Sequence, residues 1–213
     1  MSNDALIEKL VDGLRPVSRR SVGRLAGILA VLAAVELAGF LALGTMRPDI
    51  DAALGRPAFW WKMGGLAALA LSGVGVALRS FYPVSSPRKG LLRWGLIVGG
   101  LVIVGAFIDA AGQRGVDIPG RLLWRMGVEC LVVMTALSVP PVIALGIMMR
   151  RGAPTDRQAS AAAVGVAAAA WGAFIFAFHC PSDDPLYIVF WYALGSGVIT
   201  LLARAVLPAA ARW

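Results

Sequence analysis

The sequence has little charge and little of the side-chain chemistry that enzymes use. Only 15% of its 213 residues are Asp, Glu, Lys or Arg, whereas a soluble domain carries roughly a quarter. It contains one histidine and two cysteines, with no paired His-x-x-x-His, no Cys-x-x-Cys, no Walker loop and no Gly-x-Ser-x-Gly turn. These absences argue against a soluble domain, and we expect a protein that is not an enzyme.

Hydrophobic residues make up 59% of the chain and fall into six long runs. About 20 apolar residues cross a bilayer, and every run is long enough. The predicted spans are residues 25–46, 59–78, 92–111, 126–149, 159–178 and 186–207. The sequence therefore predicts an all-α polytopic bundle of six transmembrane helices over 25–207. A cytoplasmic segment at 1–24 precedes it, and a cytoplasmic tail at 208–213 follows.

The net charge of +8 is better explained by membrane topology than by nucleic-acid binding. Lys and Arg concentrate in the short cytoplasmic connections of multi-pass proteins. Of the 20 basic residues, 14 fall on the side of the N-terminus when the six spans are threaded through a bilayer. We expect both termini in the cytoplasm, the lipid bilayer as a partner, and no direct contact with nucleic acid.

A short amphipathic helix is predicted before the first span. Its apolar residues recur on one helix face, and these residues are Leu6, Ile7, Leu10, Val11 and Leu14. A helix of about 11 residues is marginal in water, so that face needs a surface to cover it. Three interpretations stay open: a helix on the membrane or against the inner ends of the spans, a docking helix for a cytosolic protein, or a frayed segment.

The predicted topology places both cysteines near the outer surface. Cys130 lies in the first turns of the fourth span, and Cys180 lies just beyond the fifth. The outer side is oxidising in bacteria, so the pair could form a reversible disulfide. Neighbouring carboxylates would raise the pKa of the thiols. The alternative is two buried, inert cysteines beside a loop-capping Asp-Asp-Pro turn.

The neighbours of the two cysteines also suggest a transient metal site. Thiols, an imidazole and carboxylates suit zinc or cadmium, acting here as an inducer and not as a resident cofactor. The candidate ligands are Cys130, Cys180, His179, Glu129, Asp183 and Asp184.

Other polar residues stand out within or beside the spans. Glu36 sits at mid-depth in the first span, where it should face the bundle and serve packing or proton translocation. Arg121, Arg125 and Glu129 recur every four residues, which predicts one face of a helix that begins near Pro119, with Arg125 and Glu129 paired. Together with Asp109 this face should form a polar pocket.

Pro140 and Pro141 fall inside the fourth span. Each proline removes an amide donor, which predicts a kink at this point. Such a kink could link the outer pocket to the inner face.

The motifs resemble the NrsF family, bacterial membrane anti-sigma factors that negatively regulate sigma F, an extracytoplasmic-function sigma factor. The resemblance runs from residue 4 to the C-terminus. It rests on Leu-Ile-Glu-Lys-Leu-Val-Asp-Gly-Leu-Arg-Pro-Val at 6–17, the six spans, one cysteine early in span four, and Cys-Pro-Ser-Asp-Asp-Pro-Leu-Tyr-Ile-Val-Phe-Trp-Tyr-Ala-Leu-Gly at 180–195.

The resemblance implies that the chain holds an extracytoplasmic-function sigma factor at the bacterial inner (cytoplasmic) membrane and releases it under oxidative or heavy-metal stress. It implies that Cys130 and Cys180 sense the signal and that the N-terminal helix contacts the sigma factor. It assigns no metal role to His179. Two other hypotheses stay open: a membrane thiol oxidoreductase that passes electrons to quinone, and a small proton-coupled transporter that uses Glu36.

Overall fold

The computed structural model is all-helical over the part of the chain that it describes, which is residues 7, 8, 11, 21–44, 46–83, 85–112 and 117–210. Six helices are long and apolar enough to cross a membrane, which confirms the predicted bundle. The helices are α2 (Val22–Ala42), α3 (Ile50–Ala53), α4 (Pro57–Ser80), α5 (Pro87–Ala111), α6 (Ile118–Leu122), α7 (Trp124–Arg150), α8 (Arg157–Phe176) and α9 (Pro185–Ala210).

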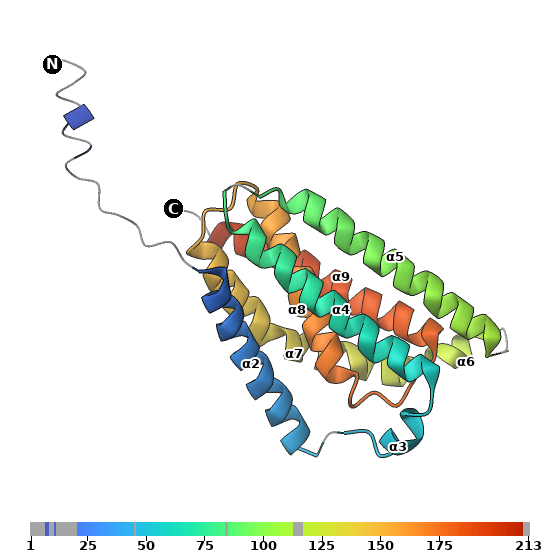
Figure 1. The fold of residues 1–213 in the computed structure, drawn as a ribbon. Coiled ribbons are helices and arrows are strands. Elements are labelled where there is room, and N and C mark those ends of the chain that lie inside the picture. The colour runs from blue at the N-terminus through green and yellow to red at the C-terminus, as the bar shows by residue number, and fades with distance from the viewer. Residues whose placement is uncertain are drawn as a thin grey trace.

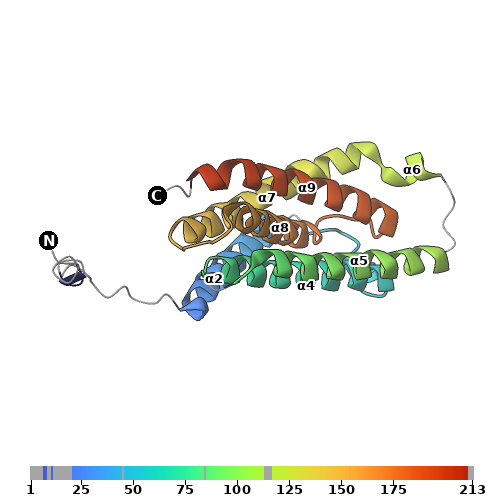
Figure 2. The same ribbon diagram turned by 90° about the horizontal axis from the view of Figure 1, so that it is seen from above.

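Helix α8 is the core of the bundle. Figure 2 shows it between one layer formed by α2, α4 and α5 and a second layer formed by α7 and α9. Its sequence is rich in alanine, and small residues allow helices to approach closely where lipid gives no hydrophobic drive. At Gly172 a side chain would collide with Ser138 and the Met134 carbonyl, so glycine is required where α8 crosses α7.

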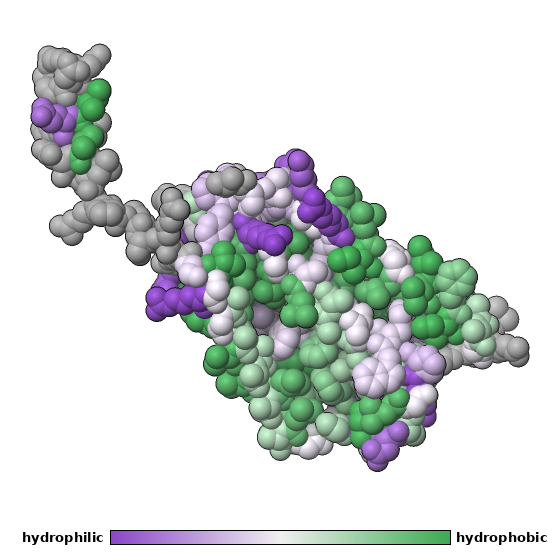
Figure 3. All heavy atoms as spheres, in the orientation of Figure 1, coloured by the Kyte–Doolittle hydropathy of each residue, from purple (hydrophilic) through white to green (hydrophobic). Residues whose placement is uncertain are grey.

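The outer helices α2 and α5 have very few fully buried residues. Leu29 is the one buried residue of α2, and Pro87 and Gly105 are those of α5. In Figure 3, apolar side chains cover the middle of the visible face and hydrophilic ones gather toward its ends. This pattern fits helices whose outward faces meet lipid.

The helices alternate in direction, so their connections gather at two ends (Figure 1). We call the end formed by residues 43–56, 117–123 and 177–184 the cysteine end, because Cys180 lies there and Cys130 lies close by. The opposite end is the basic end, where α2 and α8 begin and α4 and α7 finish. Its described cations are Arg24, Arg79, Arg88, Lys89, Arg93, Arg150, Arg151, Arg157 and Arg204.

Two expectations about the fourth span meet different outcomes. Arg121 does not share a continuous helix with Arg125 and Glu129, because Leu123 adopts a left-handed conformation (φ 44°) that separates α6 from α7. The predicted common face is therefore wrong. Helix α7 continues through Pro140 and Pro141, so the prolines interrupt its hydrogen bonding without ending it, and the kink itself stays a prediction.

Candidate functional site: a buried thiol pair under an ionic clamp

The two cysteines are neighbours at the cysteine end. Cys130 lies in the second turn of α7 and Cys180 four residues after α8 ends, and both are buried and free. Cys130 is the main influence on the pKa of Cys180, so the two thiols are neighbours, and Cys130 Sγ lies 2.8 Å from Tyr187 Oη. Neighbouring thiols have little distance to travel before they could form a disulfide.

Helix α9 supplies the rest of the thiol pocket. Tyr187 and Tyr192 are buried, and Tyr192 Oη lies beside Cys180 without meeting strict hydrogen-bond geometry. Asp184 positions this helix, because its Oδ1 accepts from Leu186 N at 2.9 Å and its carbonyl accepts from Ile188 N at 3.0 Å. The Asp-Asp-Pro turn thus caps α9 and presents its tyrosines to the sulfurs.

Cys180 is the more acidic thiol of the pair. Hydrogen bonding to Cys130 is the main cause that lowers its pKa below the ordinary value of a thiol. Burial opposes this shift, and the positive charge of Lys62 adds to it. The expectation that carboxylates raise the pKa is therefore wrong for Cys180, and the carboxylate of Asp183 is paired with Arg47 and Lys62.

Those cations form an ionic clamp, which we define as Arg47, Lys62 and Asp183. All three are buried, at 2%, 1% and 7% exposure. Asp183 Oδ1 lies 2.8 Å from both Arg47 Nη1 and Lys62 Nζ, and Asp183 Oδ2 lies 3.1 Å from Arg47 Nη2. Burial raises the pKa of Asp183, but the hydrogen bonds and charges of the two cations outweigh it and hold that pKa below its ordinary value.

The clamp also holds the backbone around Cys180. Arg47 N donates to the Phe178 carbonyl at 3.0 Å. Its guanidinium donates to the carbonyls of Cys180 at 3.2 Å and of Pro181 at 2.8 Å. Lys62 Nζ donates to the carbonyls of Cys180 at 3.1 Å and of Ser182 at 3.0 Å. Four backbone carbonyls between α8 and α9, which have no partner in a helix, are thereby satisfied.

The clamp extends to the surface through two exposed partners. Asp49 accepts from Arg47 Nε at 2.7 Å and from Nη2 at 2.8 Å, and the Arg47 hydrogen bond is the main cause that lowers the pKa of Asp49 to about 2. Arg56 Nη1 lies 3.4 Å from Asp183 Oδ2. The segment that follows α2 is thus tied to the segment that follows α8.

A second ion cluster joins α5, α6 and the loop before α9. Arg121 donates to Asp184 at 2.7 and 2.9 Å and also pairs with Asp109. Asp109 therefore lies beside Arg121, while the expected polar pocket stays a prediction. Trp191 Nε1 donates to the Leu122 carbonyl at 2.7 Å, which fixes the end of α6 against α9.

The structure does not bring the six candidate metal ligands together. Asp183 and Asp184 are occupied by cations, as described above. Glu129 is exposed and lies 4.0 Å from Arg125, while the exposed His179 packs its ring against Phe40 and Phe176. Among the residues that the structure describes, no group of three or more His, Cys, Asp or Glu side chains could hold a metal ion. Only the two thiols remain adjacent.

Glu36 has one partner, on the central helix. Its Oε2 accepts from Trp171 Nε1 at 2.9 Å, whereas its Oε1 is buried and has no hydrogen-bond partner in the described part of the chain. This bond ties the exposed helix α2 to α8 at mid-depth, which is a packing role.

The N-terminal helix is described only in part. Ile7 and Val11 are helical, and their side chains are 58% and 56% exposed. Leu6, Leu10 and Leu14, which were expected on the same apolar face, lie outside the described residues.

Sequence reasoning missed the clamp and the two tyrosines. The sequence did contain a signal for the two cations. Most basic residues fall on the side of the N-terminus, whereas Arg47 and Lys62 are among the few on the opposite side. Cations on that side are expected to have acidic partners, but the same side also carries Asp49 and Asp51, so the sequence does not single out Asp183. No periodicity pointed to Tyr187 or Tyr192.

Comparisons with known proteins agree on one family. The family described as Negative regulator of sigma F matches residues 10–213. The Anti-sigma-F factor NrsF of Caulobacter vibrioides (strain NA1000 / CB15N) is 29% identical over 197 residues, covering 90% of this chain and 88% of that protein. The Probable anti-sigma-F factor NrsF of Azospira oryzae (strain ATCC BAA-33 / DSM 13638 / PS) is 31% identical over 198 residues, covering 92% of each.

No solved structure matches the chain. The family match spans nearly the whole length, including the Cys180 loop, the clamp and α9. This chain therefore belongs to the NrsF family of negative regulators of sigma F.

Proposed function

We propose that the chain holds an extracytoplasmic-function sigma factor at the cytoplasmic face of the bacterial inner membrane and releases it when Cys130 and Cys180 are oxidised. The observation that carries this proposal is the pair of neighbouring, buried, free thiols, one of them with a lowered pKa, under a buried ionic clamp. A thiolate is the reactive form of cysteine, so Cys180 is the nucleophile of the pair.

The proposed oxidation needs an external oxidant, which we take to be a peroxide. The Cys180 thiolate attacks the peroxide, the O–O bond breaks, and Cys180 becomes a sulfenic acid as one water or alcohol leaves. Cys130 then attacks the Cys180 sulfur, a disulfide forms and water leaves. The two thiols lose two electrons in total, and the peroxide gains them.

The route to the opposite end runs through Arg47 and α2. Arg47 holds the backbone of residues 178–183 and lies five residues after α2 ends. Helix α2 has one buried residue and leads directly to the N-terminal segment. A shift of the Cys180 loop would therefore move α2 more easily than any other span. A tenfold weaker hold on the sigma factor requires the binding free energies of the reduced and the oxidised protein to differ by about 1.4 kcal/mol.

The sigma factor is proposed to dock on the apolar face of the N-terminal helix, which comprises Leu6, Ile7, Leu10, Val11 and Leu14. The exposure of Ile7 and Val11 supports this, since an apolar face open to water favours a groove on a partner. Deleting residues 1–14 should free the sigma factor. Ile7→Asp with Val11→Asp should do the same, whereas Glu8→Gln on the polar side should not.

The sensing step is tested with a sigma-dependent reporter in cells exposed to peroxide. Cys130→Ser, Cys180→Ser and the double variant should lose induction, and Glu129→Gln, an exposed neighbour of Cys130, should keep it. Alkylation of the free thiols, read by mass, should show two thiols lost on induction. Normal induction in the double variant would falsify the sensing step and leave the anti-sigma role standing.

The proposed orientation has its own test. In a Cys130→Ser/Cys180→Ser background, Arg125→Cys would mark the cysteine end and Ser86→Cys the basic end. A maleimide that cannot cross membranes should label the first in intact spheroplasts and the second only after lysis. The reverse result would place the basic end outside.

A further inference from the structure

The basic end contains a cavity of about 260 Å³ between α4 and α5. Liquid water occupies roughly 30 Å³ per molecule, so the cavity has room for a group much larger than one water. It is lined at its mouth by Arg79, Lys89 and Arg93, and its walls include Val76, Trp94 and Ile97. The cavity is thus basic at the end of the bundle and apolar toward mid-depth.

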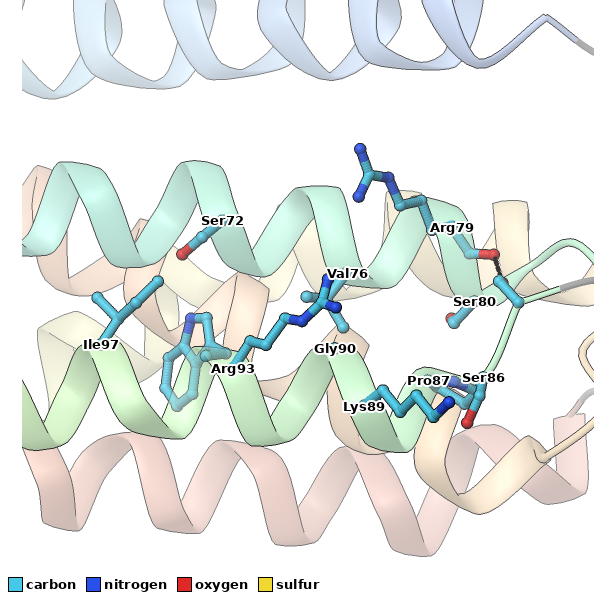
Figure 4. A pocket seen from close by; sticks show the side chains of 12 residues that line it. Ser72, Val76, Arg79, Ser80, Ser86, Pro87, Lys89, Gly90, Arg93 and Ile97 are labelled. Atoms are coloured by element: carbon cyan, nitrogen blue, oxygen red, sulfur yellow. Dashed lines mark hydrogen bonds between the residues drawn. The ribbon is translucent and has the colours of Figure 1, made fainter.

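The three cations that line the cavity come from two helices. In Figure 4, Arg93 extends from α5 toward Val76 of α4 and Lys89 lies along the start of α5 beside Ser86, whereas the Arg79 side chain reaches outward from α4, away from α5. All three are exposed. Over the residues that the structure describes, none of them forms an ion pair, whereas nearby Arg88 pairs with Asp156 at 2.9 Å. Among the described residues, Lys89 and Arg93 therefore place two positive charges at the cavity without a counter-ion, and Arg79 adds a third at its edge.

The backbone adds to the positive electrostatic potential at the cavity. Helix α5 begins at Pro87, and its N-cap Ser86 makes no side-chain capping bond. The first amides of the helix are left without an internal partner, and the positive end of the helix dipole lies at the same place. Ser85 also lines the cavity, and its hydroxyl donates to the carbonyls of Arg79 and Tyr82, which holds Ser85 against the end of α4.

The walls suit an acyl chain. Ile97 is 39% exposed and lies two turns below Lys89, while Trp94 is anchored by its Nε1 to the Leu69 carbonyl at 3.0 Å. Indole rings favour the level of lipid headgroups, where one edge meets water and the rest meets hydrocarbon. The polar mouth and the apolar wall follow one another in the same order as the headgroup and chain of a phospholipid.

We propose that this cavity binds one anionic phospholipid, with its phosphate between Lys89 and Arg93 and an acyl chain along Val76 and Ile97. Basic pockets between transmembrane helices on the cytoplasmic side bind such headgroups. The site is independent of the thiol pair. It uses the proposed function only in that the basic end faces the cytoplasmic leaflet.

The test is native mass spectrometry of the full chain, purified in neutral detergent and titrated with phosphatidylglycerol or phosphatidylcholine. Phosphatidylglycerol should bind at least tenfold more tightly than phosphatidylcholine. The triple variant Arg79→Gln, Lys89→Gln and Arg93→Gln should weaken the binding of phosphatidylglycerol about tenfold or more. A charge-retaining set, Arg79→Lys, Lys89→Arg and Arg93→Lys, should stay within about threefold of the wild type.

The matched control removes three charges from the same end outside the cavity, through Arg150→Gln, Arg151→Gln and Arg157→Gln. This control should keep phosphatidylglycerol binding. Equal loss in both triple variants would overturn the proposal, because diffuse surface charge would then account for binding. Displacement of the lipid by inorganic phosphate at equal concentration would also overturn it, because the site would then recognise a free anion.

Discussion

Arg47 and Asp183 lie 136 positions apart in the sequence and form a two-point ion pair, with nitrogen–oxygen distances of 2.8 and 3.1 Å. The pair is buried and is completed by Lys62. It joins the first third of the chain to the loop that carries Cys180, so its loss should affect both stability and signalling.

Removing the arginine of this pair should be costly. Arg47→Gln leaves Lys62 as the one buried cation beside Asp183 and removes the hydrogen-bond donor from the carbonyls of Cys180 and Pro181. Breaking a buried ion pair costs about 3–5 kcal/mol. We expect a clearly lower thermal unfolding midpoint in detergent and higher basal sigma activity. Arg125→Gln, at an exposed arginine of the same end, should change stability by less than about 0.5 kcal/mol. Similar midpoints for the two variants would contradict the clamp.

The reactivity of Cys180 should follow pH with a midpoint below that of an ordinary thiol. Because its pKa is lowered, the thiol is a thiolate above that midpoint, and protonation slows its reaction as the pH falls below it. The rate of iodoacetamide labelling, resolved by peptide mass, measures this profile. Lys62→Met removes a stabilising positive charge and should move the midpoint upward, whereas Lys89→Met at the opposite end should not. An unchanged midpoint in Lys62→Met would argue against electrostatic activation.

Cadmium should bind the thiol pair alone. Two adjacent thiolates are soft ligands, and the other four candidate ligands lie apart or are occupied by cations. Thiolate-to-cadmium charge-transfer absorption should appear with one ion per chain and vanish in Cys130→Ser or Cys180→Ser. His179→Ala and Glu129→Gln should keep it. Loss of the absorption in either of these two variants would show that cadmium also binds a ligand other than the two thiols.

Gly127 should be irreplaceable. A Cβ at this position would lie inside the ring of Trp191, which itself anchors α6 through the Leu122 carbonyl. Gly127→Ala should therefore lower the unfolding midpoint, at a cost of roughly 1–3 kcal/mol from overpacking. At Gly99 nothing lies within 4 Å of such a Cβ, so Gly99→Ala should be neutral or stabilising by up to about 1 kcal/mol.

The bond between Glu36 and Trp171 should matter for packing and not for transport. Glu36→Gln keeps an acceptor for the indole, so stability should change little. Trp171→Phe leaves both carboxylate oxygens without a donor and should cost about 1–3 kcal/mol. Thermal unfolding measures both variants. Proton uptake into vesicles that is lost in Glu36→Gln would contradict the packing role and favour a transporter.

The six spans could be predicted because hydrophobic length alone specifies them, and the structure shifts their ends by only a few residues. The first span ends at Ala42 and not at 46, and α5 begins at Pro87 because proline is preferred in the first turn. The approach of Cys130 to the Cys180 loop also followed from topology. The break at Leu123 did not, because a leucine gives no local signal for a left-handed residue.

The ionic clamp could not be predicted because its members are distant in sequence and their pairing depends on how the helices pack. Local patterns indicate the faces of single helices, whereas Arg47 and Lys62 meet Asp183 only after the segment that follows α2, the first turns of α4 and the loop before α9 gather at one end. The same reason explains the metal ligands. Asp183 and Asp184 are close to Cys180 in sequence, but their carboxylates form ion pairs with Arg47, Lys62 and Arg121.

Helix α2 spans 21 residues, a length of roughly 31 Å at 1.5 Å per residue, and only Leu29 among them is buried. A helix with so little buried surface experiences the thickness of the hydrocarbon layer directly, and mismatch costs fractions of a kcal/mol per ångström. If α2 carries the signal as proposed, its tilt makes the hold on the sigma factor depend on the lipid composition of the membrane as well as on the protein.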